Sequence, residues 1–187
     1  MNPQELGRAE DIERILIDEK VIEKRLDAMA EQIDREFPSG PIVALILLKG
    51  ALVFAADLLR RLPRPLDIEC LKVASYHGGT ESSGVVTFLD HALPDVQGRH
   101  VLLLDDILDT GRTLQAVTQR LLSEGCAAVH TAVLLAKDRT REAEIDADYV
   151  GFVIGDEFVV GYGLDYKGRY RNLPFVGVLK SDIATPH

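Results

Sequence analysis

The sequence predicts a doubly wound α/β fold, in which helices cover the faces of a central, mostly parallel sheet. Apolar runs typical of strands buried on both faces occur at Ile42–Leu48 and Val101–Leu104, and Ala128–Leu135 is expected to form a further buried strand. Segments with helical periodicity separate these runs, so strands and helices alternate along the chain. In such a fold, ligands bind beyond the carboxyl ends of the strands.

The remaining elements follow from periodicity and from helix-ending residues. Asp18 is expected to cap a helix whose apolar stripe contains Ile22, Leu26, Met29, Ala30 and Ile33. Further helices are expected at Ala51–Leu62, before the turn at Pro63 and Pro65, and at Thr113–Glu124, before Gly125. Shorter strands are expected at Arg14–Ile17, Ile68–Ala74, Val85–Leu89, Tyr149–Val153, Phe158–Val160 and Phe175–Leu179. No linker or repeat divides the chain, so we expect one domain over residues 1–187.

Composition and charge restrict the class of partner. The 187 residues carry a net charge of −9, which argues against a nucleic-acid or anionic membrane surface. A phosphate-bearing ligand would therefore need local backbone amides, a few placed cations or a metal. Cys70 and Cys126 lie far apart in the sequence, in no metal-ligand spacing. The N-terminal stretch has no apolar core of signal-peptide length, and we expect a cytoplasmic protein.

The stretch Val101–Leu114 (VLLLDDILDTGRTL) is the most informative part of the sequence. A buried strand delivers Asp105, Asp106 and Asp109 to its carboxyl end, and a turn of small residues then opens a helix. Carboxylates accept hydrogen bonds from a sugar diol, and amides at a helix N-terminus bind phosphate. Aspartate and threonine also serve as plain helix caps, but three aspartates exceed what one helix end needs. The pattern predicts a sugar-phosphate site.

Other loops after strands have their own chemical character. Leu48-Lys49-Gly50 allows close backbone approach and offers a cation, Ser75–Gly84 is rich in glycine and hydroxyls, and Lys137–Arg141 (KDRTR) is cationic. Each of these is also compatible with an ordinary exposed turn. Near the C-terminus, Phe158 could stack on a flat ligand, and Asp165 lies between apolar or aromatic neighbours.

Together these segments resemble the hypoxanthine (hypoxanthine-guanine) branch of the type I phosphoribosyltransferases. The similarity rests on VLLLDDILDTGRTL, LLKG, SYHGGTESSG and FVVGYGLDYKGRYRNLPFVGVL, which occur in family order from about Ile12 to Leu179. It implies the type I fold, with a flexible catalytic loop and a small hood made from the chain termini. It also implies Mg²⁺-dependent transfer of a phosphoribosyl group from phosphoribosyl pyrophosphate to hypoxanthine or guanine, giving the nucleotide and pyrophosphate in purine salvage.

The resemblance implies a role for each matching residue. Asp105 and Asp106 would bind the ribose hydroxyls, and Asp109 would act as the general base at N7 of the purine. The 5′-phosphate would lie on Asp109, Thr110, Gly111, Arg112 and Thr113. Pyrophosphate would be held by Lys49, Gly50 and Arg141, with a cis peptide before Lys49. The purine would contact Lys137, Phe158, Val159 and Asp165, and Lys137 would select a 6-oxo group over the amino group of adenine.

The resemblance also implies a metal site, a moving loop and subunit contacts. Asp165, with Asp105 and Asp106, would bind Mg²⁺. Ser75 and Tyr76 would close over the site with their loop. The partners would be phosphoribosyl pyrophosphate and a 6-oxopurine, with no nucleic acid and no membrane. The chain would form a homodimer or homotetramer.

The segment DRTRE after Lys137 replaces a proline-containing turn of many relatives, and Asp138 could alter the charge near the base or pyrophosphate. This departure leaves open the preferred 6-oxopurine and the duty of Arg141. A xanthine- or guanine-preferring transferase is one alternative, because backbone groups near Val159 and Asp165 would decide contacts to the purine 2-position. Another is a regulator of the same fold that binds RNA or nucleotides, although the acidic charge argues against it.

Overall fold

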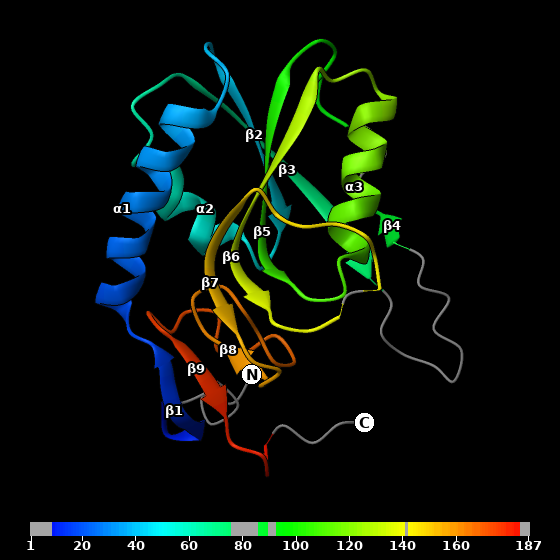
Figure 1. Cartoon of the computed structure of the whole chain (residues 1–187). Helices are drawn as coiled ribbons and strands as arrows, with labels where there is room; N and C mark the ends of the chain where they lie inside the picture. The colour runs from blue at the N-terminus through cyan, green and yellow to red at the C-terminus, as the bar shows by residue number, and fades with distance from the viewer. Residues whose placement is uncertain (1–8, 76–85, 90–92, 141, 184–187) are drawn as a thin grey trace.

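The computed structural model describes residues 9–75, 86–89, 93–140 and 142–183. It has a layered α/β body and a smaller sheet at one end, where the first and last described strands lie side by side (Figure 1). The predicted α/β architecture with a central, mostly parallel sheet and a small hood is confirmed. No helix among the described residues is long and apolar enough to cross a membrane.

The large sheet has the strand order β4-β3-β2-β5-β6-β7. All its neighbouring strands are parallel except β4, which pairs antiparallel with β3. β2 and β5 therefore lie at its centre, and their apolar runs Ile42–Leu47 and Val101–Leu104 are buried, as expected for strands covered on both faces. The strands span Ile42–Leu48 (β2), Leu66–Ser75 (β3), Val86–Phe88 (β4), His100–Leu108 (β5), Ala128–Lys137 (β6) and Tyr149–Ile154 (β7).

Helices cover both faces of this sheet: α1 (Glu19–Glu36) and α2 (Leu52–Leu59) lie on one face, and α3 (Arg112–Ser123) lies on the other (Figure 1). The Asp18 side chain accepts a hydrogen bond from the backbone amide of Lys20, so the predicted cap of α1 is confirmed. The predicted apolar stripe of α1 is also confirmed, since its five residues are all buried.

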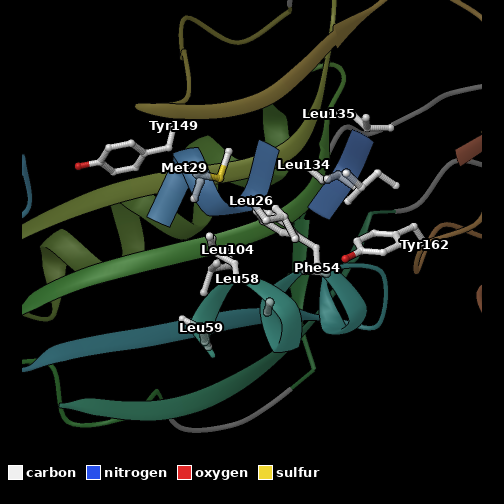
Figure 2. Packing of buried hydrophobic residues seen from close by; sticks show 14 of the residues in the cluster. Leu26, Met29, Phe54, Leu58, Leu59, Leu104, Leu134, Leu135, Tyr149 and Tyr162 are labelled. Atoms are coloured by element: carbon white, nitrogen blue, oxygen red, sulfur yellow. The ribbon is translucent and has the colours of Figure 1, made fainter. Parts of the chain in front are cut away.

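Two hydrophobic clusters fill the spaces between these layers. Figure 2 shows the larger cluster, where Leu26 and Met29 of α1, Phe54 and Leu58 of α2, and Leu104 of β5 come together. A second cluster joins the opposite face of the sheet to α3 through Leu114, Val117 and Leu121. Burial of apolar surface on both faces holds the central strands in place, and with them the residues at their carboxyl ends.

The hood is a three-stranded antiparallel sheet with the order β1-β9-β8. Its strands are β1 (Ile12–Ile17), β8 (Val159–Val160) and β9 (Val176–Leu179). A short 3₁₀ turn at Ala9–Asp11 precedes β1, and the Tyr170 hydroxyl donates a hydrogen bond to Asp11 at 2.9 Å. The two ends of the described chain are thereby joined below the large sheet.

The predicted end of the central strand at Leu104 is wrong. β5 continues to Leu108, because it pairs with β6 from His100↔Ala128 through Leu108↔Ala136. Asp105 and Asp106 are therefore strand residues and not loop residues. The predicted helix at Ala51–Leu62 is also too long, since α2 ends at Leu59 and Arg61 and Leu62 form a turn.

Candidate active site

A cleft opens where the two central strands separate. β2 and β5 are paired only as far as Ile46↔Leu104. β5 stays paired with β6 for four more of its residues, as far as Leu108↔Ala136. The last part of β5 is thus left without a neighbour on one side. The cleft that results is lined by Leu47, Leu48, Gly50, Val73, Asp105, Asp106, Ile107, Leu108, Asp109, Thr110, Gly111, Thr113, Leu114, Asp165 and Arg171.

Asp105 and Asp106 lie in the floor of this cleft. The amide of Asp106 donates to Oδ1 of Asp105, and the amide of Ile107 donates to Oδ1 of Asp106, both at 2.9 Å. Burial raises the pKa of Asp105 well above its usual range, and the adjacent Asp106 charge raises it further. Burial also raises the pKa of Asp106. Two carboxylates in this position favour a ligand that supplies hydrogen-bond donors or positive charge.

The turn after β5 leads directly into α3. Gly111 has a left-handed backbone with φ of +80°, and a β-carbon there would lie 2.8 Å from Cγ2 of Ile145. Gly111, the N-cap residue, has no side chain to cap the helix, and Thr110 Oγ1 accepts a long hydrogen bond of 3.5 Å from the Arg112 amide. The first amide groups of α3 have no partners within the helix and point out of its N-terminal end. Arg112 pairs with Glu142 and does not line the cleft, while Thr110, Gly111 and Thr113 do. The turn thus offers amides and hydroxyls to an anion.

The opposite wall is the loop after β2, and its Leu48–Lys49 peptide bond is cis, as the resemblance implies. Leu48 and Gly50 line the cleft, whereas the Lys49 side chain is exposed and does not. A β-carbon on Gly163 would lie 2.2 Å from the Gly50 carbonyl oxygen. Only glycine fits at Gly163, which also has φ of +101°, so the C-terminal segment packs directly on this loop.

A second hollow adjoins the first and has a different character. Its lining residues are Asp106, Ile107, Asp109, Lys137, Glu157, Phe158, Val159, Leu164 and Asp165. Phe158 keeps 48% of its surface exposed and meets Tyr166 edge to face, with ring centroids 5.4 Å apart. Lys137 ends β6, and its ammonium group lies 3.2 Å from Oδ1 of Asp156. An exposed aromatic face beside a lysine suits a flat ring with an acceptor group.

The segment from Gly161 to Leu173 carries Asp165 to the junction of the two hollows. Oδ1 of Asp165 lies 2.6 Å from the Arg171 guanidinium, and Oδ2 accepts from the amide of Gly168 at 2.6 Å. Arg171 also donates to the Gly163 carbonyl and lines the first cleft. Arg171 was not among the residues expected from the sequence. The only hint in the sequence is that Arg171 lies six residues after Asp165, a spacing that allows an ion pair across a turn.

Tyr162 anchors the same segment to α2. Its hydroxyl donates to Oδ2 of Asp57 at 2.5 Å, and its ring lies beside Phe54 (Figure 2). Burial raises the pKa of Tyr162, and the Asp57 carboxylate raises it further, so the hydroxyl stays a donor. Sequence reasoning did not single out either residue, because their contact depends on the fold.

Most predicted site residues therefore lie around one double hollow. Of the other candidates, Ser75 is the last residue of β3. Tyr76 and Arg141 lie outside the described residues. Asp138 is exposed, and its amide donates to the Ile154 carbonyl away from both linings.

Comparisons with known proteins agree with this geometry. The model of the phosphoribosyl transferase domain matches residues 14–167. The chain is 42% identical over 173 residues to a hypoxanthine-guanine phosphoribosyltransferase of Staphylococcus epidermidis, covering 92% of this chain and 97% of that protein. The chain belongs to the type I phosphoribosyltransferase family, in its hypoxanthine-guanine branch.

Solved structures of this branch have the same fold. A hypoxanthine phosphoribosyltransferase of Staphylococcus aureus superimposes with a TM-score of 0.89 at 39% identity, covering 95% of this chain and 96% of that one. A hypoxanthine-guanine phosphoribosyltransferase of Bacillus anthracis gives a TM-score of 0.85 at 37% identity, covering 90% of this chain and 99% of that one. The structure of the latter contains a HEPES molecule in its active site.

Proposed function

We propose that this protein transfers the phosphoribosyl group of phosphoribosyl pyrophosphate to hypoxanthine and guanine, as its hypoxanthine-guanine phosphoribosyltransferase relatives are named for doing. The observation that carries the proposal is the junction of the two hollows. Asp106, Asp109 and Asp165 line both of them, so a sugar phosphate in one would meet a flat base in the other. The reaction belongs to purine salvage.

The turn after β5 would bind the 5′-phosphate through the amides and hydroxyls of Thr110, Gly111 and Thr113. Arg112 would contribute its backbone, because its side chain is engaged by Glu142. Asp105 and Asp106 would accept hydrogen bonds from the two ribose hydroxyls. This placement would put C1 of the ribose at the junction, facing the second hollow.

The base would lie against Phe158, with its 6-oxo group accepting from Lys137 and its edge meeting backbone groups of Val159. The bond from C1 to pyrophosphate breaks, and pyrophosphate leaves with the electron pair. N9 of the purine supplies the electron pair of the new bond to C1, and the proton on N7 passes to the carboxylate of Asp109. Adenine would bring an amino group to Lys137, donor to donor, and would be rejected.

Pyrophosphate would lie beside Gly50, with Lys49, Arg141 and Arg171 as its cationic neighbours. Arg171 is added here to the residues expected from the sequence, because its guanidinium lines the cleft. Ser75 and Tyr76 would close over the site and exclude water from the reacting carbon.

The chemistry of the donor set fits a magnesium ion. Asp105, Asp106 and Asp165 bring carboxylate oxygens to one cleft, and burial disfavours negative charge on the first two. No group of three His, Cys, Asp or Glu side chains within the described ranges could hold a metal together. Mg²⁺ would therefore share few protein carboxylates with substrate oxygens and water, and would neutralise charge on the pyrophosphate.

Product analysis tests the proposal. We expect hypoxanthine, phosphoribosyl pyrophosphate and Mg²⁺ to give inosine monophosphate and pyrophosphate in equal amounts, and we expect a magnesium chelator to stop the reaction. Free ribose phosphate without nucleotide would contradict transfer to the base. Unchanged turnover in the chelator would contradict the metal requirement alone.

Subunit association as a homodimer or homotetramer is part of the proposal. Leu52 of α2 leaves 51% of its surface exposed on the side of the helix that the core does not cover. Light scattering after size-exclusion chromatography tests the expected mass, and a monomer at micromolar concentration would contradict it.

A further inference from the structure

Four charged side chains form a series of ion pairs that runs between Asp109 and Lys137, two residues that line the second hollow. Arg139 Nε lies 3.1 Å from Oδ1 of Asp109, and Arg139 Nη1 lies 3.2 Å from Oδ1 of Asp156. The ammonium group of Lys137 lies 3.2 Å from the same Asp156 oxygen. The charges alternate in sign along Asp109, Arg139, Asp156 and Lys137, a series called here the charged array. Its two end members line the hollow.

At one end of the array, a buried carboxylate oxygen of Asp109, Oδ1, has no hydrogen-bond donor among the described residues. A buried carboxylate oxygen without a donor is costly. The guanidinium of Arg139 offsets this cost by its charge, although Nε is not aligned for a hydrogen bond. The side chain of Asp109 as a whole is 39% exposed, so the exposed surface belongs to side-chain atoms other than Oδ1.

The other end of the array depends on Asp156. One oxygen of this carboxylate accepts hydrogen bonds from both Lys137 and Arg139. The hydrogen bond and charge of Lys137, followed by those of Arg139, hold the pKa of Asp156 below its usual value. The side chain of Lys137 is only 12% exposed, so a partner that holds its ammonium in place also sets where it points.

We propose that Arg139 is a positioning residue for the transfer reaction: it holds one oxygen of Asp109 so that the rest of the carboxylate faces the purine, and Asp156 ties it to Lys137. This inference rests on the proposed function and adds two residues to its site. The charged array then fixes the positions of Asp109, the general base, and Lys137, which selects the 6-oxo group, relative to each other. A base must satisfy both ends together.

Arg139 occurs in the segment DRTRE after Lys137, where the family resemblance leads us to expect a proline-containing turn. Arg139 is two residues beyond Lys137, and the amide of Asp138 between them is bonded to the Ile154 carbonyl of β7. This bond holds the chain beside the end of β7, and both side chains reach Asp156, two residues after the last residue of that strand. The departure thus has a structural use.

A double-mutant cycle between Asp109 and Arg139 tests the inference. We expect Arg139→Gln to lower kcat with hypoxanthine about twofold to fivefold, the upper part of the range for a partly exposed ion pair, with the Kd of phosphoribosyl pyrophosphate changed less than about twofold. In an Asp109→Asn background the same substitution should have little further effect. Arg139→Lys should recover part of the loss. Arg120→Gln, at a helix-surface pair with Glu124, is the matched control and should leave all values unchanged.

Additive losses in the two backgrounds would overturn the inference, and so would an equal loss of phosphoribosyl pyrophosphate affinity, because a purely structural role predicts both. If Arg139→Gln does not fold, Asp156→Asn tests the same array without touching Asp109. We expect about a twofold to fivefold loss of kcat there, and no loss would overturn the inference. A wild-type protein silent with every base contradicts the proposed function, whereas an active wild type with an unaffected variant contradicts this inference alone.

Discussion

Gly50 and Asp106 are in direct contact: a β-carbon on Gly50 would lie 1.6 Å from Oδ2 of Asp106 and 2.4 Å from its Cγ. The loop after β2 therefore packs on the second aspartate of β5. Gly163 packs on the other side of the same loop. Three segments that are far apart in the sequence thus meet at Gly50, and a side chain there would displace the residues expected to bind ribose and pyrophosphate.

Gly50→Ala tests this contact. The alanine methyl group must push Asp106 out of its place, and Asp106 has little room because its Oδ1 is bonded to the amide of Ile107. We expect kcat/KM for phosphoribosyl pyrophosphate to fall about 100-fold, since displacements near 1 Å have that effect on positioned groups. Steady-state kinetics with varied phosphoribosyl pyrophosphate measure it.

Gly98→Ala is the control for that substitution. Gly98 has a positive φ of +68°, unlike Gly50, but nothing lies within 4 Å of the added β-carbon. We expect a small loss of stability and unchanged kinetics. Equal kinetic losses in the two variants would refute the importance of the Gly50 contact.

Asp105→Asn should stabilise the ligand-free protein at neutral pH. Because the pKa of Asp105 is raised on folding, its carboxyl is held protonated more strongly in the folded chain than in the unfolded one. Stability from this group is thus complete below its ordinary pKa near 3.8 and is lost as pH rises through the raised value. We expect the variant to melt roughly 2–4 °C higher than wild type at pH 7.5 and equally at pH 4.

Thermal unfolding at several pH values measures this difference. A variant less stable than wild type at pH 7.5 would mean that the carboxylate is satisfied without a ligand. Binding of phosphoribosyl pyrophosphate should be lost in the same variant, because an amide replaces a group expected to accept from the ribose diol.

His130 should limit stability on the acid side. Burial lowers the pKa of His130. The charge of Asp148 opposes this lowering, and the charge of His100 adds to it. The centre of the His130 ring lies 4.6 Å from that of the Phe37 ring. A lowered pKa means that stability is complete above the ordinary value of 6.5 and is lost as pH falls through the folded value. Nε2 of His130 is buried without a hydrogen bond from the described residues, so the ring acts as an apolar group.

His130→Phe should therefore reduce the loss of unfolding free energy between pH 7 and pH 5, as measured by urea denaturation. His100→Phe should reduce this loss less, because the charge of His100 is the smallest of the causes that set the pKa of His130 and its ring lies 6.0 Å away. The same acid loss in His130→Phe as in wild type would show that protonation of other groups causes it.

Lys137→Ala should weaken the nucleotide more than phosphoribosyl pyrophosphate. The ammonium lines the second hollow and not the first, so we expect at least a tenfold weaker Kd for inosine monophosphate and less than a twofold change for phosphoribosyl pyrophosphate. Isothermal titration calorimetry measures both, with Lys180→Ala on the surface as the control. Equal losses for the two ligands would place Lys137 at the phosphates instead.

Much of the fold could be predicted because burial leaves a clear pattern in the sequence. The apolar run at Ile42–Leu48 is a central strand with the predicted bounds, and the stripe from Ile22 to Ile33 lies on the core as periodicity requires. The end of β5 could not be predicted, because Asp105 and Asp106 are polar residues inside a strand. Pairing with β6 keeps them extended, and the cleft makes their polarity tolerable.

Side-chain contacts within the site were harder to predict than its residues. Arg171 reaches Asp165 through a turn in which Lys167 and Tyr170 have positive φ without being glycine. Such backbone conformations leave no periodic pattern in a sequence. Arg139 likewise read as a surface cation, because its partners Asp109 and Asp156 lie in other parts of the chain and meet it only in the folded protein.

The most direct measurement is the initial rate with phosphoribosyl pyrophosphate and Mg²⁺ against hypoxanthine, guanine, xanthine and adenine, followed by ultraviolet absorbance. We expect turnover with hypoxanthine or guanine and none with adenine, because Lys137 would face the 6-position with a donor. The ranking of the three 6-oxopurines then identifies the preferred base. Turnover with adenine at a comparable rate would contradict the place given to Lys137, and silence with all four bases would contradict the transferase itself.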